Sequence, residues 1–179
     1  MRCFVAIELP ESLKQRLGRV QQDFDDEGIS LVKRGALHIT LSFLGDISGE
    51  ESEEVEKELA GVRLHGFGAW CRGLGFFSPN RINVIFAKIH DGEGFSELYE
   101  SVSGAVKRVV NLKEERGYVP HVTIARVCWG NRGGLERRIM EHDDEEFGEF
   151  HVRSFSLKKS TLTPNGPIYE TLREFPLER

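Results

Sequence analysis

The sequence predicts an α+β fold in which two similar lobes, each made of a sheet and helices, meet at a central groove. Short apolar runs typical of strands alternate with segments whose apolar residues recur at helical spacing. The order strand, helix, strand also occurs twice. In one copy His38 lies 31 residues after Ile7, and in the other His121 lies 32 residues after Ile89. No low-complexity linker separates the copies, so we expect one bilobal domain over residues 1–179.

The N-terminal part of the chain is expected to begin with a strand over residues 2–9. Pro10 suits the first turn of a helix, so a helix is expected to begin there. Its apolar residues form one stripe: Leu13, Leu17, Val20 and Phe24. A strand follows over 37–44, and the capping-box spacing of Ser48 and Glu51 then predicts the start of a second helix. The short apolar face of that helix consists of Val55, Leu59 and Val62.

The rest of the chain continues the alternation of strands and helices. A turn at Ser78-Pro79-Asn80 separates two expected strands, over 67–77 and 82–89. A third helix carries the apolar stripe Phe95, Leu98, Val102, Val106 and Val109. The last expected elements are a strand over 119–127, a weaker helix over 132–142, and strands over 150–161 and 168–175.

The composition indicates a globular cytoplasmic protein with no membrane partner. An apolar fraction of 39%, with 12 Phe and two Trp, is enough to build a core. No apolar run approaches the roughly 18 residues that span a bilayer, and the first eight residues lack the features of a secretory signal. No P-loop pattern is present, which excludes that class of nucleotide hydrolase. Neither a disulfide framework nor a zinc site is indicated by the widely spaced Cys3, Cys71 and Cys128.

Charge is unevenly distributed along the chain, whose formal net charge is −5. Residues 46–58 contain seven acidic residues and one basic residue, and residues 141–149 contain six acidic residues and no basic one. These two segments are expected to be solvated helix faces or turns. Outside them basic residues outnumber acidic ones, so the sequence allows a local basic cleft for a phosphate group. It does not suggest the long basic track of a duplex-binding protein.

Two of the expected strands carry the same polar pattern. One reads Leu37-His38-Ile39-Thr40-Leu41, and the other reads Pro120-His121-Val122-Thr123-Ile124. Successive side chains of a strand point to opposite faces, so each histidine projects together with the threonine two residues later. Random placement of the six His and five Thr would give roughly 0.2 such pairs, so two of them at equivalent points of a repeat indicate function. Ordinary surface or core-edge roles are expected for the remaining histidines: His65, His90, His142 and His151.

The two pairs together predict a site for a tetrahedral anion. Imidazoles titrate near neutral pH, so one histidine can donate a proton while the other accepts one. The hydroxyls of Thr40 and Thr123 can donate hydrogen bonds to the anionic oxygens. Because the site is nearly symmetric, the sequence does not decide which of His38 and His121 is the acid. No carboxylate cluster accompanies the motifs, so neither a metal ion nor a cofactor is expected.

These motifs resemble the two-histidine phosphoesterase superfamily, and the whole chain is similar to its group of 2'-5' RNA ligases, or RNA 2',3'-cyclic phosphodiesterases. The resemblance includes residues 4–7 (FVAI), 37–45 (LHITLSFLG) and 120–126 (PHVTIAR). It extends to the long tail motif at residues 157–169 (LKKSTLTPNGPIY). The segment before His38 departs from the group, which often has Trp and Asn there. The residues of this chain at those places are Leu31 and Ala36.

The resemblance implies hydrolysis of RNA ends that carry a 2',3'-cyclic phosphate, which leaves a 2'-phosphomonoester. In reverse it implies joining of such an end to a 5'-hydroxyl through a 2'-5' bond. RNA ends, with tRNA halves among them, are therefore the expected partners, and the protein is expected to act as a monomer. The resemblance also implies that His38 donates a proton and His121 accepts one.

Three further residues are candidates for binding substrate in the groove. Arg126 aligns with an arginine of the group and is a candidate contact to phosphate or RNA, but on a regular strand it would face away from His121. Tyr169 and Lys158 are the other candidates. One alternative remains open at this point: a module that binds RNA ends or nucleotides with only marginal turnover. Two intact His-x-Thr pairs favour catalysis, because simple binding does not need two titrating groups.

Overall fold

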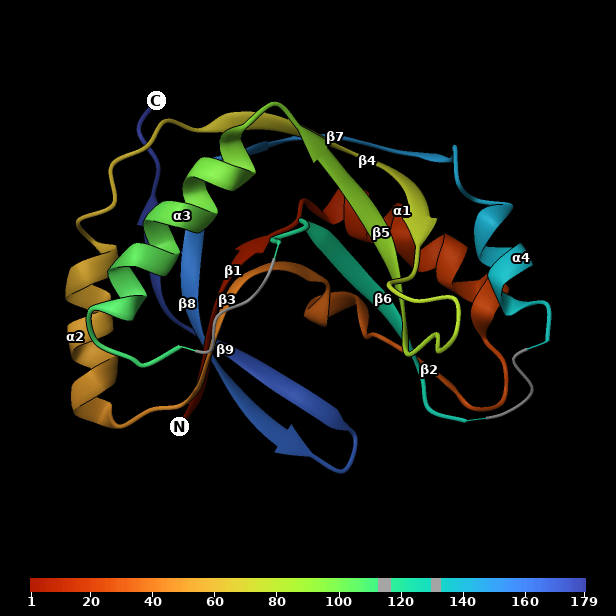
Figure 1. The fold of residues 1–179 in the computed structure, drawn as a ribbon, viewed down its shortest axis with the longest axis horizontal. Helices are drawn as coiled ribbons and strands as arrows, with labels where there is room; N and C mark the ends of the chain where they lie inside the picture. Colours follow the sequence, from red (N-terminus) through yellow and green to blue (C-terminus); the bar gives the residue numbers. More distant parts are fainter. Residues whose placement is uncertain (113–116, 130–132) are drawn as a thin grey trace.

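The computed structural model describes residues 1–112, 117–129 and 133–179, and within them nine strands form two antiparallel sheets (Figure 1). The strand order is β3-β1-β8-β9 in the first sheet and β2-β6-β5-β4-β7 in the second. The first sheet consists of β1 (Arg2–Glu8), β3 (His38–Asp46), β8 (Ser154–Thr163) and β9 (Gly166–Pro176). The second consists of β2 (Ile29–Leu31), β4 (Phe67–Gly75), β5 (Val84–Asp91), β6 (His121–Val127) and β7 (Glu146–Val152). The predicted α+β fold with two sheet-and-helix lobes is confirmed.

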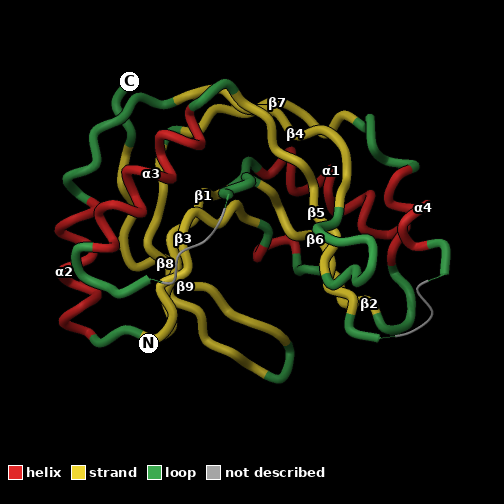
Figure 2. Tube along the Cα trace, viewed as in Figure 1, coloured by secondary structure: helices red, strands yellow, loops and turns green. Residues whose placement is uncertain are grey.

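The helices lie at the two ends of the molecule, α2 and α3 at one end and α1 and α4 at the other (Figure 2). Their bounds are α1 (Glu11–Gln21), α2 (Gly49–Leu59), α3 (Gly94–Lys107) and α4 (Leu135–Met140). Helix α1 follows a strand of the first sheet but packs on β6 and β7 of the second, whereas α3 follows a strand of the second sheet and packs on β3 of the first. This exchange joins the lobes, and one apolar cluster extends through both. None of the helices in the described residues is long and apolar enough to cross a membrane.

The sequence signals for the helices are confirmed with small shifts of their ends. Helix α1 begins one residue after Pro10, which is its N-cap. At the start of α2, the Ser48 hydroxyl accepts from the Glu51 backbone N–H at 3.0 Å, and the Glu51 carboxylate accepts from the Ser48 N–H at 2.7 Å. Of the helix predicted over 132–142, residue 132 lies outside the described residues, and the rest contains α4. The stripe predicted for the first helix is buried: Leu13, Leu17, Val20 and Phe24.

The single strand predicted over 150–161 is wrong. The chain forms two strands there, β7 and β8, which are separated at Arg153. Strand β7 pairs with β4 in the second sheet, and β8 pairs with β1 in the first, so the chain crosses between the sheets at this point. The apolar residues at 150 and 152 are followed by apolar residues at 155 and 157, so the alternation shifts by one residue at Arg153. This shift marks a break, but it does not show which sheet each strand joins. Strand β2 is missing from the prediction because three residues are too short to show a period.

The two histidine strands contain matching β-bulges. In the β1–β3 pair the register shifts so that β3 has one extra residue between Thr40 and Ser42. In the β5–β6 pair, β6 has one extra residue between Thr123 and Ala125. Each bulge thus directly follows the threonine of its motif, and the two strands share one pattern of burial along their length. This shared irregularity confirms that the two lobes are related by pseudo-symmetry.

Strands β8 and β9 form a long hairpin that extends from the body of the molecule (Figure 1). Its turn ends at Gly166, whose φ of +101° favours a residue without a Cβ atom. The turn and the start of β9 place Asn165, Pro167 and Tyr169 along one groove between the lobes. The hairpin therefore forms part of the wall of the site described next.

Candidate active site

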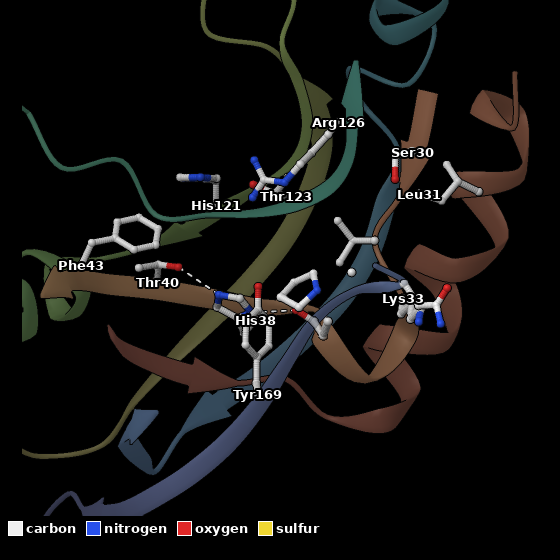
Figure 3. A pocket seen from close by; sticks show the side chains of 15 residues that line it. Ser30, Leu31, Lys33, His38, Thr40, Phe43, His121, Thr123, Arg126 and Tyr169 are labelled. Atoms are coloured by element: carbon white, nitrogen blue, oxygen red, sulfur yellow. Dashed lines mark hydrogen bonds between the residues drawn. The ribbon is translucent and has the colours of Figure 1, made fainter. Parts of the chain in front are cut away.

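A groove with a cavity volume of about 250 Å³ brings the two His-x-Thr pairs together. His38 and Thr40 enter it from β3, and His121 and Thr123 enter it from β6 on the opposite side (Figure 3). Strand β9 and the segment 30–36 complete its walls. The arrangement agrees with the prediction that both pairs face one shared site.

Two hydrogen bonds hold the ring of His38. Its Nδ1 lies 2.7 Å from the carbonyl oxygen of Ala36, and because a carbonyl only accepts, Nδ1 carries a hydrogen and donates it. Its Nε2 lies 3.0 Å from Thr40 Oγ1. In the neutral ring the threonine hydroxyl donates to Nε2, and in the imidazolium Nε2 donates to the hydroxyl. Nε2 is therefore the atom of His38 that can exchange a proton with a substrate.

His121 is oriented in the same way as His38. Its Nδ1 lies 2.7 Å from the carbonyl oxygen of Val119 and donates to it. In both motifs the carbonyl belongs to the residue two positions before the histidine. The Nε2 atoms of both rings are therefore the ones left for proton transfer, which is the arrangement that paired acid–base chemistry requires.

Each histidine also packs against two aromatic rings that contact each other. Beside His38, the Tyr169 ring makes a T-shaped contact at 5.2 Å between centroids, and the buried Phe4 ring lies 5.0 Å away. Beside His121, the Phe77 ring makes a T-shaped contact at 5.1 Å, and the buried Phe86 ring lies 5.2 Å away. These ring contacts restrict the orientation of the two imidazoles.

The environment lowers the pKa of His38. Burial among aromatic rings is the main cause, because it disfavours the charged form. The positive charges of Lys158 and Arg126 lower this pKa further, while the bond to Ala36 and the charge of Glu8 oppose the shift. In the free protein the neutral form of His38 is therefore favoured.

Arg126 lines the groove together with both histidines (Figure 3). The expectation that it faces away from His121 assumed a regular strand, and the bulge after Thr123 breaks that regularity. One extra residue reverses the alternation, so Ile124 and Ala125 are both buried and Arg126 returns to the groove face. Tyr169 also lines the groove, as predicted from the tail motif.

Lys158 does not line the groove. Its side chain is buried, and its ammonium group forms an ion pair with the Glu8 carboxylate. Lys14, also buried, donates to the same carboxylate at 3.2 Å. Glu8 is the residue of β1 opposite His38, so this group of charges lies behind the histidine and influences it only electrostatically. Direct contact between Lys158 and substrate has no support in this geometry.

Other groove residues are missing from the prediction. Lys33 adds a second cation, and Phe43 closes the end of the groove away from Lys33 (Figure 3). Leu31 and Ala36, where the segment departs from the family pattern, also line the wall. Phe43 lies inside the first motif, and its position five residues after His38 matches that of Arg126 after His121, a signal that the sequence did contain.

Among the residues that the structure describes, no three His, Cys, Asp or Glu side chains are grouped so as to hold a metal ion. Catalysis without a metal stays a prediction.

Comparison with known proteins identifies the family. The chain matches the LigT like Phosphoesterase family over residues 7–86 and 93–169, which include both His-x-Thr strands. It is 38% identical to the RNA 2',3'-cyclic phosphodiesterase of Methanocaldococcus jannaschii, over 98% of this chain and 100% of that protein. It is 31% identical to the protein of the same name from Archaeoglobus fulgidus, over 98% and 99% of the two chains.

Solved structures share the whole fold. A crystal structure of a protein from Thermus thermophilus matches with a TM-score of 0.83 and 32% identity, over 98% of this chain and 97% of that one. Escherichia coli LigT matches with a TM-score of 0.85 over 99% and 98% of the two chains, and at 22% identity this match shows the fold alone. With motifs, fold and nearly full-length relatives in agreement, the chain belongs to the LigT-like phosphoesterase family.

Proposed function

We propose that this protein is a metal-independent RNA 2',3'-cyclic phosphodiesterase that leaves a 2'-phosphomonoester. The observation that carries the proposal is the matched orientation of two imidazoles at one groove. Both commit Nδ1 to a backbone carbonyl and both have a threonine two residues later that lines the same groove. The relatives from M. jannaschii and A. fulgidus, which bear the name RNA 2',3'-cyclic phosphodiesterase, support the same reaction class.

The reaction requires one proton acceptor and one proton donor on opposite sides of phosphorus. His121 takes a proton from the attacking water, whose oxygen forms a new bond to phosphorus. His38 gives a proton to the 3'-oxygen as the bond between phosphorus and that oxygen breaks. The phosphate then remains on the 2'-oxygen. This assignment of the two roles follows the family resemblance.

His38 takes up its proton when substrate binds. Its lowered pKa favours the neutral ring in the free protein. A phosphate anion bound beside the ring favours the imidazolium, because an opposite charge within about 4–6 Å stabilises the charged form. Substrate binding therefore prepares the acid at the place where it is needed.

The two hydroxyls and two one-sided residues bind and orient the substrate. Thr40 and Thr123 donate to the non-bridging oxygens, whose negative charge grows in the transition state. Arg126 contacts the phosphate from the β6 side only, and Tyr169 contacts the ribose or base from the β9 side only. Burial raises the pKa of Tyr169, so its phenol stays protonated and can donate a hydrogen bond. These two residues break the symmetry of the His-x-Thr pairs.

The substrates that we propose are RNA ends with a 2',3'-cyclic phosphate, including tRNA halves. The same site would join such ends to a 5'-hydroxyl in the reverse reaction. We further propose that the protein works in the cytoplasm as a monomer. Lys33 and Arg126, the two cations among the described residues that line the groove, suit the phosphates of a single RNA strand.

A labelled RNA ending in a 2',3'-cyclic phosphate, incubated with the protein in EDTA, tests the proposal. Opening of the ring exposes a monoester that phosphatase removes, whereas the cyclic ester resists phosphatase. We expect turnover in EDTA at the same rate as without it. Binding of the RNA without turnover would instead identify a binding module. Activity lost in EDTA and restored by Mg²⁺ or Zn²⁺ would identify a metal-dependent hydrolase.

A further inference from the structure

A second hollow lies beside the groove, on the side of His121. Its cavity volume is about 280 Å³, close to the volume of about 250 Å³ for the groove. The two hollows share Thr40, Phe43 and His121, so these three residues stand between them. His38 lines only the groove, whereas His121 lines both. The two hollows therefore offer room for a substrate with a nucleoside on each side of phosphorus, one nucleoside in each hollow.

The second hollow is the pseudo-symmetric counterpart of the groove. Phe77 holds the place beside His121 that Tyr169 holds beside His38. The two T-shaped contacts have interplanar angles of 85° and 89°. Phe77 rests on a buried phenylalanine, Phe86, at 4.5 Å, as Tyr169 rests on Phe4 at 5.0 Å. Because Tyr169 is proposed to contact the ribose or base of one nucleoside, Phe77 is placed to stack on the base of another.

The charges of the two hollows differ. In the groove, the carbonyl of Ala36 accepts a hydrogen bond from His38. Val119 has the same role in the second hollow, where its carbonyl accepts from His121. Phe43 occupies the place of Arg126, and no Lys, Arg, Asp or Glu is among the described residues that line the second hollow. The groove in contrast contains Lys33 and Arg126. The described lining of the second hollow is largely apolar and aromatic, which suits a flat ring that stacks.

The exposure of the apolar side chains around the second hollow also supports a nucleobase as its ligand. Phe43 is 59% exposed and Phe77 is 60% exposed, and Val119 beside them is 53% exposed. Three large apolar side chains with free surface around one catalytic histidine form a platform on which a base can stack. Base stacking requires such a face and no charged partner.

We propose that the second hollow binds the nucleoside that carries the 5'-hydroxyl, with its base stacked on Phe77. The inference rests on the proposed function. In ligation this 5'-hydroxyl takes the place of water: it loses its proton to His121, and its oxygen bonds to phosphorus. The bond from phosphorus to the 3'-oxygen breaks, and that oxygen takes a proton from His38. The product is a 2'-5' linkage. In the reverse reaction the linkage is cleaved to a 2',3'-cyclic phosphate and a free 5'-hydroxyl.

Two substrates that differ only in the second base test the proposal. One is a 2'-5'-linked adenylyl adenosine, and the other has an abasic ribose as its second nucleoside. The readout is the ratio of their kcat/KM values for cleavage, followed through a label on the first nucleoside. For the unmodified protein we expect a preference of roughly 5- to 150-fold for the complete dinucleotide, the range that stacking of one base gives. Both kcat/KM values in a ratio are measured on the same variant. A displacement of His121 would therefore change both values alike and would cancel in the ratio.

Phe77→Ala is expected to bring the ratio close to one, and Phe77→Tyr to restore it. Trp70→Ala is the matched control, since Trp70 is also a partly exposed aromatic residue against a histidine, His90, and lines neither hollow. It should keep the preference of the unmodified protein. A ratio near one before mutation, or a ratio that survives Phe77→Ala, would overturn the inference.

The proposed function is tested separately with 2',3'-cyclic AMP, which has no second nucleoside. Hydrolysis of the cyclic nucleotide without any cleavage of the dinucleotide overturns the inference and leaves the proposed function standing. Failure to hydrolyse 2',3'-cyclic AMP overturns the proposed function, and the inference with it.

Discussion

Phe43 and Arg126 occupy equivalent positions of the two histidine strands, each five residues after its histidine and each exposed just beyond a bulge. One side chain is an apolar ring, and the other is a permanent cation. The His-x-Thr pairs are nearly identical, so on their own they would accept a cyclic phosphate in either of two orientations. In the proposed mechanism the difference between Phe43 and Arg126 favours one of these orientations, and the product depends on which orientation is bound.

Arg126→Gln is expected to lower kcat/KM for 2',3'-cyclic AMP roughly 10- to 150-fold, because one hydrogen bond to a charged group contributes that range. Steady-state kinetics at low salt measure the loss. Arg63→Gln serves as the control, since the Arg63 side chain is exposed and bonds only backbone carbonyls near the end of α2. Equal kinetics for the two variants would contradict a phosphate contact by Arg126.

His38→Ala and His121→Ala are each expected to lower kcat by roughly 10²–10⁴-fold, the usual contribution of one general acid or base. The two histidines act in one displacement, so the double variant should lose far less than the product of the single losses. Single-turnover rates of the three variants measure this. Near-complete turnover by either single variant would rule out the two-histidine mechanism.

Thr40→Val and Thr123→Val are expected to lower kcat by roughly 10²–10³-fold, the effect of removing one donor to a developing negative charge. Thr40→Ser should recover most of the rate, because it keeps the hydroxyl that also bonds His38. Thr171→Val, on the exposed face of β9, is the control for loss of a strand threonine. A loss confined to KM would mean that the hydroxyls bind the ground state and the transition state equally.

Stability is expected to depend on pH through His38. The pKa of His38 is lower in the folded protein than the ordinary value of about 6.5, mainly through burial. The unfolded chain therefore binds more protons in the interval below that value, and the free energy of unfolding rises with pH there. Stability should be complete above about pH 6.5 and should fall as the pH drops toward the folded pKa.

Urea denaturation at pH 5.5 and 7.5 measures this effect. His38→Gln should reduce the difference in the free energy of unfolding between the two pH values, and His65→Gln controls for loss of an exposed imidazole. Glu8 also affects stability, but in a lower interval. Burial alone would raise its pKa, yet Lys158 and Lys14 lower it overall, so its contribution is lost only at more acidic pH. An unchanged difference in His38→Gln would contradict a lowered pKa of His38.

The sequence was sufficient to place both His-x-Thr pairs at one site. Alternation with period two is a local property, and it determines that His38 and Thr40 share a strand face whatever the strand pairs with. The repeat of the pattern around His121 then predicts two related lobes. Alternation predicts the wrong face for a side chain that follows a β-bulge. The bulge after Thr123 that returns Arg126 to the groove arises from pairing with β5, which no local pattern shows.

Other features depended on contacts between distant segments. Lys158 belongs to the tail motif and was therefore a candidate for binding substrate in the groove. Its side chain is instead buried and pairs with Glu8 on the neighbouring strand, behind His38. Lys33 and Phe77 lie in segments without a motif, and only the packing of the two sheets brings them beside the histidines. The alternation shifts by one residue at Arg153, but which sheet each of the two strands joins is a property of the topology.

The orientation of the product tests the central claim most directly. Incubation of 2',3'-cyclic AMP with the protein in EDTA, followed by phosphorus NMR, distinguishes 2'-AMP from 3'-AMP. If His38 protonates the 3'-oxygen while His121 activates water, 2'-AMP should be the predominant product, with no requirement for metal. Predominant 3'-AMP would contradict the assignment of His38 as the donor, and no conversion at all would contradict the proposed phosphodiesterase itself.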